Sequence, residues 1–112
     1  MYYTDMDGQS YPAQKHIRQL KGEDVITWSR NVVSSNILEV EAGTNGYHGG
    51  DSSKGARTYL RLADVGNSAM WCRAQEYDGV EIVLGGDTEL ATVIEALKWM
   101  VSVLEAQSEV GR

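Results

Sequence analysis

The sequence is poor in several features that mark particular classes of protein. It has a single cysteine, Cys72, which cannot form an internal disulfide, so we expect a reducing compartment. No stretch approaches the roughly 18 consecutive apolar residues of a membrane span. Residues 1–16 contain no basic segment followed by an apolar run, so we expect no signal peptide. A cytoplasmic location is the resulting expectation.

Positive charge is also scarce. Ten lysines and arginines face sixteen aspartates and glutamates, which gives a net charge of −6 and a sequence pI near 4.8. Binding to the phosphates of a nucleic acid needs a cationic surface, so nucleic acid is disfavoured as a partner. An acidic surface serves solubility, and it also suits a basic protein partner.

The chain has 112 residues, 42% of them hydrophobic, which is enough for one modest core. Residues 1–24 are polar without a sustained period, so we interpret them as an N-terminal arm, with a short helical turn over residues 16–21. Three large rings stand in this arm, at Tyr2, Tyr3 and Tyr11. We expect such rings to dock, either on the domain or on a neighbouring subunit. The remaining residues, 25–112, are predicted to form a single domain.

This domain begins with a series of short segments rich in β-branched residues and separated by turns. They cover residues 25–33, 37–42, 56–63, 69–75 and 80–84. No crossover helix fits between them, so we expect an antiparallel meander. Asp87 is a plausible N-cap for a helix over residues 87–106. The predicted fold class is therefore α+β, with a meander of four to five strands packed on a long C-terminal helix.

Strand alternation sorts side chains onto two faces of the predicted sheet. The set expected to meet the helix is Leu38, Val40, Ala42, Leu60, Leu62, Val80, Ile82 and Leu84. The opposite face carries Glu39, Glu41, Arg57, Tyr59 and Arg61. The fourth strand stays open, since either Trp71 with Arg73 or Met70 with Cys72 can face inward. Opposite charges on this outer face either pair across strands or, with the rings, hold an anionic nucleotide-like ligand.

The helix carries two apolar surfaces. Spacings of four, three, four and three residues form one stripe, which we expect to pack on the sheet. Its members are Leu90, Ile94, Leu97, Val101 and Leu104. Trp99 lies opposite this stripe, with Ala96, Met100 and Val103 on the flank between them. A second apolar surface is typical of a subunit interface or of a docking site for the N-terminal arm. We predict a homo-oligomer with these four residues near the contact.

Five glycines crowd residues 43–55, ahead of a strand. The run GDSSKGAR (50–57) has the two glycines of a phosphate loop but lacks its Lys-Ser/Thr and leads into a strand, so we reject that motif. The spacing also differs from a dinucleotide-binding G-x-G-x-x-G. Two interpretations stay open: a hairpin loop whose glycines serve turn geometry, or an anion nest to which Lys54 and Arg57 add charge.

The sequence contains few patterns that indicate a catalytic or metal-binding site. His48 and Asp51 are at most two ligands without a further histidine or cysteine cluster, so we expect no metal site and no cofactor. Ser52 and Ser53 near His48 do not make a triad by spacing alone, and we assign no catalytic residue. GGDS and GGDT superficially resemble the signature of diguanylate cyclases, but the rest of that signature is absent and the chain is too short.

Two segments, NILEVEAGTNGYHGGDSSKGARTYLRL and VEIVLGGDTELATVIEALKWMVSVL, resemble small proteins of bacterial phages and integrative elements. The shared pattern is a glycine-rich loop ending in Arg-Thr-Tyr and a Gly-Gly-Asp before the last helix. It covers about residues 36–106. Members of that group often have a histidine soon after the Gly-Gly-Asp, where this chain has Ser-Lys. The resemblance brings no established activity, but it implies a small acidic protein of the kind that inhibits or sequesters components of host defence.

The sequence therefore predicts a non-enzymatic, oligomeric binding protein. In one version it sequesters a phosphate-bearing nucleotide, with cations holding phosphate, a ring stacking on the base and glycine amides completing the site. The residues assigned to this ligand are His48, Asp51, Lys54, Arg57, Tyr59 and Arg61. The alternatives are an inhibitor of a basic host defence protein that uses the acidic surface and the Trp99 patch, or a small hydrolase around His48.

Overall fold

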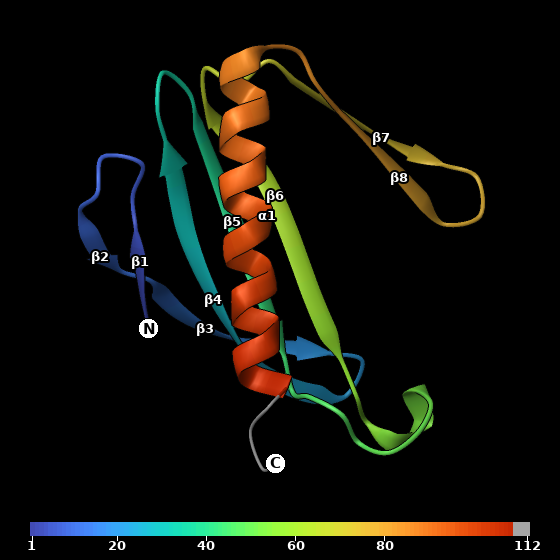
Figure 1. Cartoon of the computed structure of the whole chain (residues 1–112). Helices are drawn as coiled ribbons and strands as arrows, with labels where there is room; N and C mark the ends of the chain where they lie inside the picture. The colour runs from blue at the N-terminus through green and yellow to red at the C-terminus, as the bar shows by residue number, and fades with distance from the viewer. Residues whose placement is uncertain (109–112) are drawn as a thin grey trace.

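The centre of the fold is a four-stranded antiparallel sheet with one long helix lying across it (Figure 1). The computed structural model describes residues 1–108, and the last four residues of the predicted domain, 109–112, lie outside this part. The strand order follows the chain. The strands are β3 (Gln14–Leu20), β4 (Glu23–Val33), β5 (Ile37–Thr44) and β6 (Thr58–Gly66), and the helix is α1 (Asp87–Ser108). The predicted α+β meander with a C-terminal helix is confirmed.

Strand β3 corrects the prediction for the N-terminal arm. The helical turn expected at residues 16–21 is wrong, because this segment pairs with β4 over its whole length. Lys21 and Gly22 connect the two strands with φ angles of 46° and 89°, as a tight hairpin turn requires. The expected boundary at residue 24 thus falls inside a hairpin. Polar residues such as His16 and Arg18 occupy the partly buried side of β3, so the sequence has no hydrophobic period that predicts this strand.

The core lies between α1 and the adjacent face of β4 and β5. Its buried residues are Val32, Leu38, Val40 and Ala42 from the sheet, and Ala96, Trp99, Met100 and Val103 from the helix. The helix packs mainly on β5 and to a smaller extent on β4. In Figure 1 it runs along β5 and leaves β6 beside it. Within residues 1–108 we find no helix with the length and apolar character needed to cross a membrane.

The face of α1 that meets the sheet is not the predicted one. The stripe that includes Leu97 and Val101 was expected to be buried, yet these two side chains are 49% and 52% exposed. Trp99 and its three neighbours, assigned to an oligomer contact, lie inside the chain instead. The Trp99 ring lies beside Tyr3 and Arg30, and one tryptophan buries more apolar area than one leucine. These residues are therefore not available to a second copy.

Polar side chains fix the helix at both ends. Asn36, buried in the β4–β5 turn, donates from its amide nitrogen to the hydroxyl of Thr92 at 3.2 Å. Near the other end, Gln107 accepts from the backbone N–H of Thr44 at 2.8 Å and donates to the carbonyl of Ile26 at 2.9 Å. A buried amide that loses such a partner costs about 1–3 kcal/mol, so these bonds set the position of α1 on the sheet.

A small hairpin of β1 (Tyr2–Thr4) and β2 (Ser10–Pro12) docks on the edge of this core. The ring of Tyr3 lies edge-on to Trp99, with 6.3 Å between centroids, and the guanidinium of Arg30 is 4.0 Å from the Tyr3 ring centre. Arg30 also lies 4.0 Å from Asp5 on this hairpin. The Trp99 surface is therefore covered by the N-terminal arm, one of the two alternatives that the sequence left open.

A second hairpin, β7 (Met70–Gln75) and β8 (Gly79–Leu84), forms a separate two-stranded sheet that extends away from the helix (Figure 1). One face of this hairpin consists of the apolar pairs Met70–Leu84, Cys72–Ile82 and Ala74–Val80. Only its base reaches the core, through the partly buried Met70. The prediction that Val80 and Ile82 meet the helix is wrong, since Val80 is 70% exposed.

Candidate functional site

The glycine-rich segment between β5 and β6 is an ordered loop whose two ends meet. Asn45 holds both ends: its amide nitrogen donates to the carbonyl of Gly55 at 2.8 Å, and its amide oxygen accepts from the N–H of Arg57, also at 2.8 Å. Within it lies the short 3₁₀ helix η1 (Ser52–Lys54). A compact loop with joined ends is an Ω-loop, a type that is frequently functional. We call residues 45–57 the Ω-loop.

Arg57 fastens the Ω-loop to the neighbouring β3–β4 turn. Its guanidinium donates to four carbonyl oxygens at 2.8–3.1 Å. These belong to Leu20, Lys21, Ser52 and Ala56. A guanidinium has five N–H donors, and most of these are engaged within the chain. The charge assigned to phosphate binding is thus used to hold two loops together.

The other predicted ligand residues of the Ω-loop have local contacts. Asp51 caps η1 by accepting from the hydroxyl and the N–H of Ser53, and these hydrogen bonds lower the pKa of the Asp51 carboxyl. His48 Nε2 lies 3.2 Å from the carbonyl oxygen of Asn45. Lys54 is exposed and lies against Gly50. The hydrogen bonds of Asp51 and His48 therefore stabilise the conformation of the Ω-loop.

Tyr59 and Arg61 lie on the sheet face opposite the helix, as alternation predicts. The guanidinium of Arg61 pairs with Glu39 on the neighbouring strand, and that of Arg18 lies 5.3 Å from the ring centre of Tyr59. Charged pairs of this kind satisfy one another without a ligand. The six predicted ligand residues therefore divide between the Ω-loop and this face, and none of them lines the pocket described below.

The same face contains a buried ion pair that the sequence did not reveal. Glu41 is 1% exposed and accepts from Arg18 Nε at 2.7 Å and from the hydroxyl of Thr27. Burial raises the pKa of the Glu41 carboxyl, but the hydrogen bonds from Arg18 and Thr27 outweigh it, so its pKa is below the ordinary value. Glu41 is therefore a structural anion that ties β3, β4 and β5 together.

A histidine and a serine also meet on this face. His16 Nε2 lies 2.8 Å from Ser29 Oγ, a distance that suits a base and a nucleophile. Ser29, however, stands in β4, which is paired on both sides, so the nearby backbone N–H groups belong to the sheet ladders. Stabilising an oxyanion requires such donors to point at the reacting atom. We interpret the pair as a cross-strand hydrogen bond.

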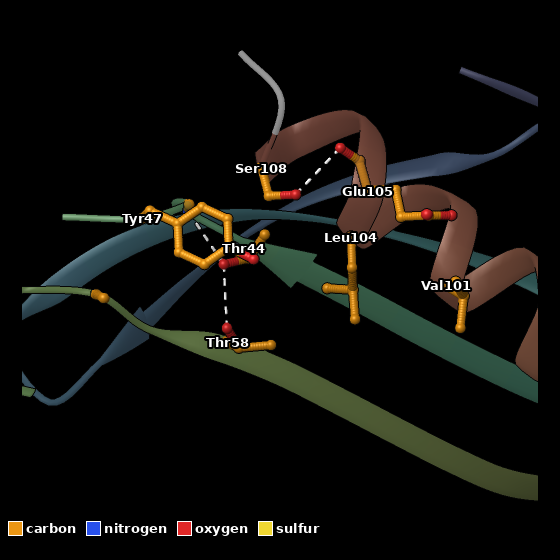
Figure 2. Close-up of a pocket in the computed structure, with 9 residues that line it drawn as sticks. Thr44, Tyr47, Thr58, Val101, Leu104, Glu105 and Ser108 are labelled. Atoms are coloured by element: carbon orange, nitrogen blue, oxygen red, sulfur yellow. Dashed lines mark hydrogen bonds between the residues drawn. The ribbon is translucent and has the colours of Figure 1, made fainter. Parts of the chain in front are cut away.

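A pocket of about 410 Å³ lies where the Ω-loop, the facing ends of β5 and β6, and the last turns of α1 come together (Figure 2). Its lining residues are Thr44, Gly46, Tyr47, Ala56, Thr58, Val101, Leu104, Glu105 and Ser108. Cavities of roughly 300–1,000 Å³ hold small ligands. We call this cavity the Ω-loop pocket.

The walls of the Ω-loop pocket combine apolar and hydroxyl groups. Val101 and Leu104 point from the helix toward the side of β6, and the hydroxyls of Thr44 and Thr58 lie 3.0 Å apart on the opposite wall (Figure 2). Tyr47 stands at the lip with 83% of its surface exposed. An apolar body can rest on the helix side while a polar group reaches the threonines.

The electrostatics of this pocket disfavour an anion. The C-terminal end of a helix carries a partial negative charge, and the last turns of α1 form one wall. The exposed carboxylate of Glu105 adds a full negative charge. The pocket therefore suits an uncharged or positively charged ligand, unlike the phosphate-bearing ligand expected from the sequence.

Sequence reasoning missed this pocket because its lining residues come from four separate segments. One signal was present: the stripe of α1 that includes Val101 and Leu104 has regular apolar spacing, although it was assigned to the wrong neighbour. Among residues 1–108 we find no group of three or more histidine, cysteine, aspartate or glutamate side chains that could hold a metal ion.

Comparison with models of known protein families, with curated proteins and with solved structures finds no match for this chain.

Proposed function

We propose that this chain is a non-enzymatic binding protein whose Ω-loop pocket takes a small molecule with an apolar body and no negative charge. The observation that carries this proposal is the pocket itself, with an apolar helix wall facing a pair of hydroxyls. The resemblance to small proteins of phages and integrative elements supports a sequestering role rather than a metabolic one.

The ordered Ω-loop supports the proposal. Arg57 and Asn45 fix the loop through hydrogen bonds to six backbone groups, so the pocket wall that it provides exists before a ligand arrives. A preformed wall lowers the ordering cost of binding. The number of internal bonds also explains why a segment with so many glycines holds one shape.

Sequestration of an anionic nucleotide stays a prediction from the sequence. The geometry supports it less, because such a ligand has to compete with the carbonyl partners of Arg57 and with the Arg61–Glu39 pair. Inhibition of a basic host defence protein by the acidic surface also stays a prediction, and it rests on the net charge of −6.

Fluorescence titration with three probes tests the proposal. The probes are Nile red, which is uncharged, thioflavin T, which is cationic, and ATP labelled on its ribose, which is anionic. We expect saturable binding of the first two and none of the third. A Thr58→Phe variant places a ring in the pocket and is expected to weaken dye binding by about tenfold or more, which is about 1.4 kcal/mol.

Thr4→Phe is the matched control, because Thr4 is an exposed strand residue remote from the pocket. This variant should bind the dyes as the unmodified chain does. If both variants lose dye affinity equally, or if Thr58→Phe leaves dye affinity unchanged, the dyes do not bind in the Ω-loop pocket. If labelled ATP binds saturably and the two dyes do not, the result supports the anionic ligand that the sequence predicted.

A further inference from the structure

The stripe on α1 that was expected to face the sheet forms an open apolar surface. Leu90, Ile94, Leu97 and Val101 are each between 44% and 55% exposed. They lie on the side of the helix that turns toward β6, because Val101 and Leu104 share the Ω-loop pocket with Thr58. Monomeric soluble proteins rarely leave a continuous apolar patch of this length in water.

The surfaces next to this stripe are also apolar and uncovered. On β6, Leu60 and Leu62 stand opposite Ala42 and Val40, on the helix side of the sheet. The helix lies over β5, so Leu60 stays 59% exposed. The apolar face of the β7–β8 hairpin continues from the core at its base and is exposed toward its tip. An isolated two-stranded hairpin is marginally stable in water, so this one needs a neighbour.

The order of residues in the stripe indicates what covers it. Spacings of four and three place Ile94 and Val101 at one type of heptad position and Leu90, Leu97 and Leu104 at the other. β-Branched residues at the first position with leucine at the second are typical of two-stranded helical contacts. The partner that such a stripe fits is another helix with the same repeat, and a second copy of this chain supplies one.

We propose that two copies of the chain form a homodimer in which the Leu90–Leu104 stripe of one α1 packs against the same stripe of the other. Each helix then also approaches the open faces of β6 and the β7–β8 hairpin of its partner. Because a two-fold axis relates the two copies, the same surface patch forms the interface on each of them. A standard-size interface takes about 800 Å² from each partner, and the exposed apolar side chains of the stripe, β6 and the hairpin are those that this dimer would cover.

Multi-angle light scattering during gel filtration tests this dimer. The unmodified chain should elute with twice its mass of 12.3 kDa. Leu97→Glu and Ile94→Glu each place a carboxylate in the stripe and should give the monomer mass. Both side chains are about half exposed, so the monomer should keep its fold, which circular dichroism checks. Ser102→Glu is the control, because Ser102 is exposed on the polar flank of the helix and has no residue of the stripe three or four positions away, and it should stay dimeric.

Two results overturn the proposal. One is a monomeric mass for the unmodified chain at its highest soluble concentration. The other is a dimer that Leu97→Glu and Ile94→Glu leave intact, since that dimer uses another surface. Val101 and Leu104 belong both to the stripe and to the wall of the Ω-loop pocket, so dye binding is titrated on the Leu97→Glu monomer as well as on the unmodified chain.

Discussion

At the scale of single residues, buried charges in this protein are held by partners on other segments. Arg30 is 4% exposed and meets Tyr3, Asp5 and Glu95, while Glu41 is held by Arg18 and Thr27. A buried charge without such partners costs several kcal/mol. These residues therefore specify how the segments around the sheet come together.

The pKa of Glu41 predicts how stability depends on pH. Its folded pKa lies below the ordinary value of 4.5, so the carboxylate contributes stability that is fully present above about pH 4.5 and is lost as the pH falls through the folded pKa. Glu41→Gln should lower the free energy of unfolding at pH 7 by about 1.5–3 kcal/mol, the value of hydrogen bonds to a charged group. Urea unfolding at pH 7 and at pH 3 measures this difference.

The loss should shrink as the pH falls through the folded pKa of Glu41, because its carboxylate then becomes protonated and neutral, as the glutamine side chain is. A difference between Glu41→Gln and the unmodified chain that is the same at both pH values contradicts this role for the carboxylate. Glu39→Gln is the control: Glu39 pairs with Arg61 at a half-exposed position and should cost less than about 1 kcal/mol.

The sequence predicted on which face of the sheet a residue lies, but it did not predict which side chain that residue contacts. Alternation placed Glu41 and Arg61 on the same side of the sheet, as the register confirms. It could not identify Arg18 as the partner of Glu41, because β3 has a polar buried side and no hydrophobic period. The candidate site shows the same limit, since two of the four carbonyl groups that hold Arg57, those of Leu20 and Lys21, are 37 and 36 residues away in the chain.

At the scale of elements, the sequence predicted where the helix lies and not how it is turned. A helix expected over residues 87–106 is observed over Asp87–Ser108. Both of its sides are apolar, so the hydrophobic period did not distinguish the side that meets the sheet. The choice follows from tertiary contacts: Trp99 gains Tyr3 and Arg30 as neighbours, and no sequence pattern links residue 3 to residue 99.

The Ω-loop gives the element-scale prediction. Arg57→Gln removes most donors that bind the loop to the β3–β4 turn, so the loop should open more often and the free energy of unfolding should fall by about 1–3 kcal/mol. Limited digestion with trypsin, followed by mass spectrometry, should show faster cleavage after Lys54. Arg73→Gln is the control, because it removes an arginine from an exposed pair on the β7–β8 hairpin. Equal cleavage rates after Lys54 in the two variants contradict the role of Arg57.

At the scale of the whole molecule, the central sheet is built from strands that are neighbours in the chain. A contact between Tyr3 and Trp99 brings the N-terminal hairpin to the C-terminal helix. Each strand from β3 to β6 pairs with the next, whereas the β1–β2 hairpin reaches α1 through Tyr3 and Trp99. Tyr3→Ala should lower the free energy of unfolding by about 1–2 kcal/mol, through lost apolar burial and the lost contact with Arg30.

Tyr2→Ala is the matched control, since Tyr2 is 71% exposed and should change stability by less than about 0.5 kcal/mol. Denaturant titrations of both variants measure the two values. If the two tyrosines cost the same, the N-terminal hairpin does not depend on this contact.

The contact between Tyr3 and Trp99 also sets an order of events while the protein is being made. Synthesis proceeds from the N-terminus at about 5–20 residues per second, so Tyr3 leaves the ribosome roughly 5–20 s before its partner ring does. The meander can pair during this interval, because its strands are neighbours in the chain. The buried face of the sheet and the first hairpin have to wait for the last helix. Docking of Tyr3 on the helix therefore cannot precede synthesis of α1, and a nascent chain that stops before residue 99 lacks the ring against which Tyr3 packs edge-on.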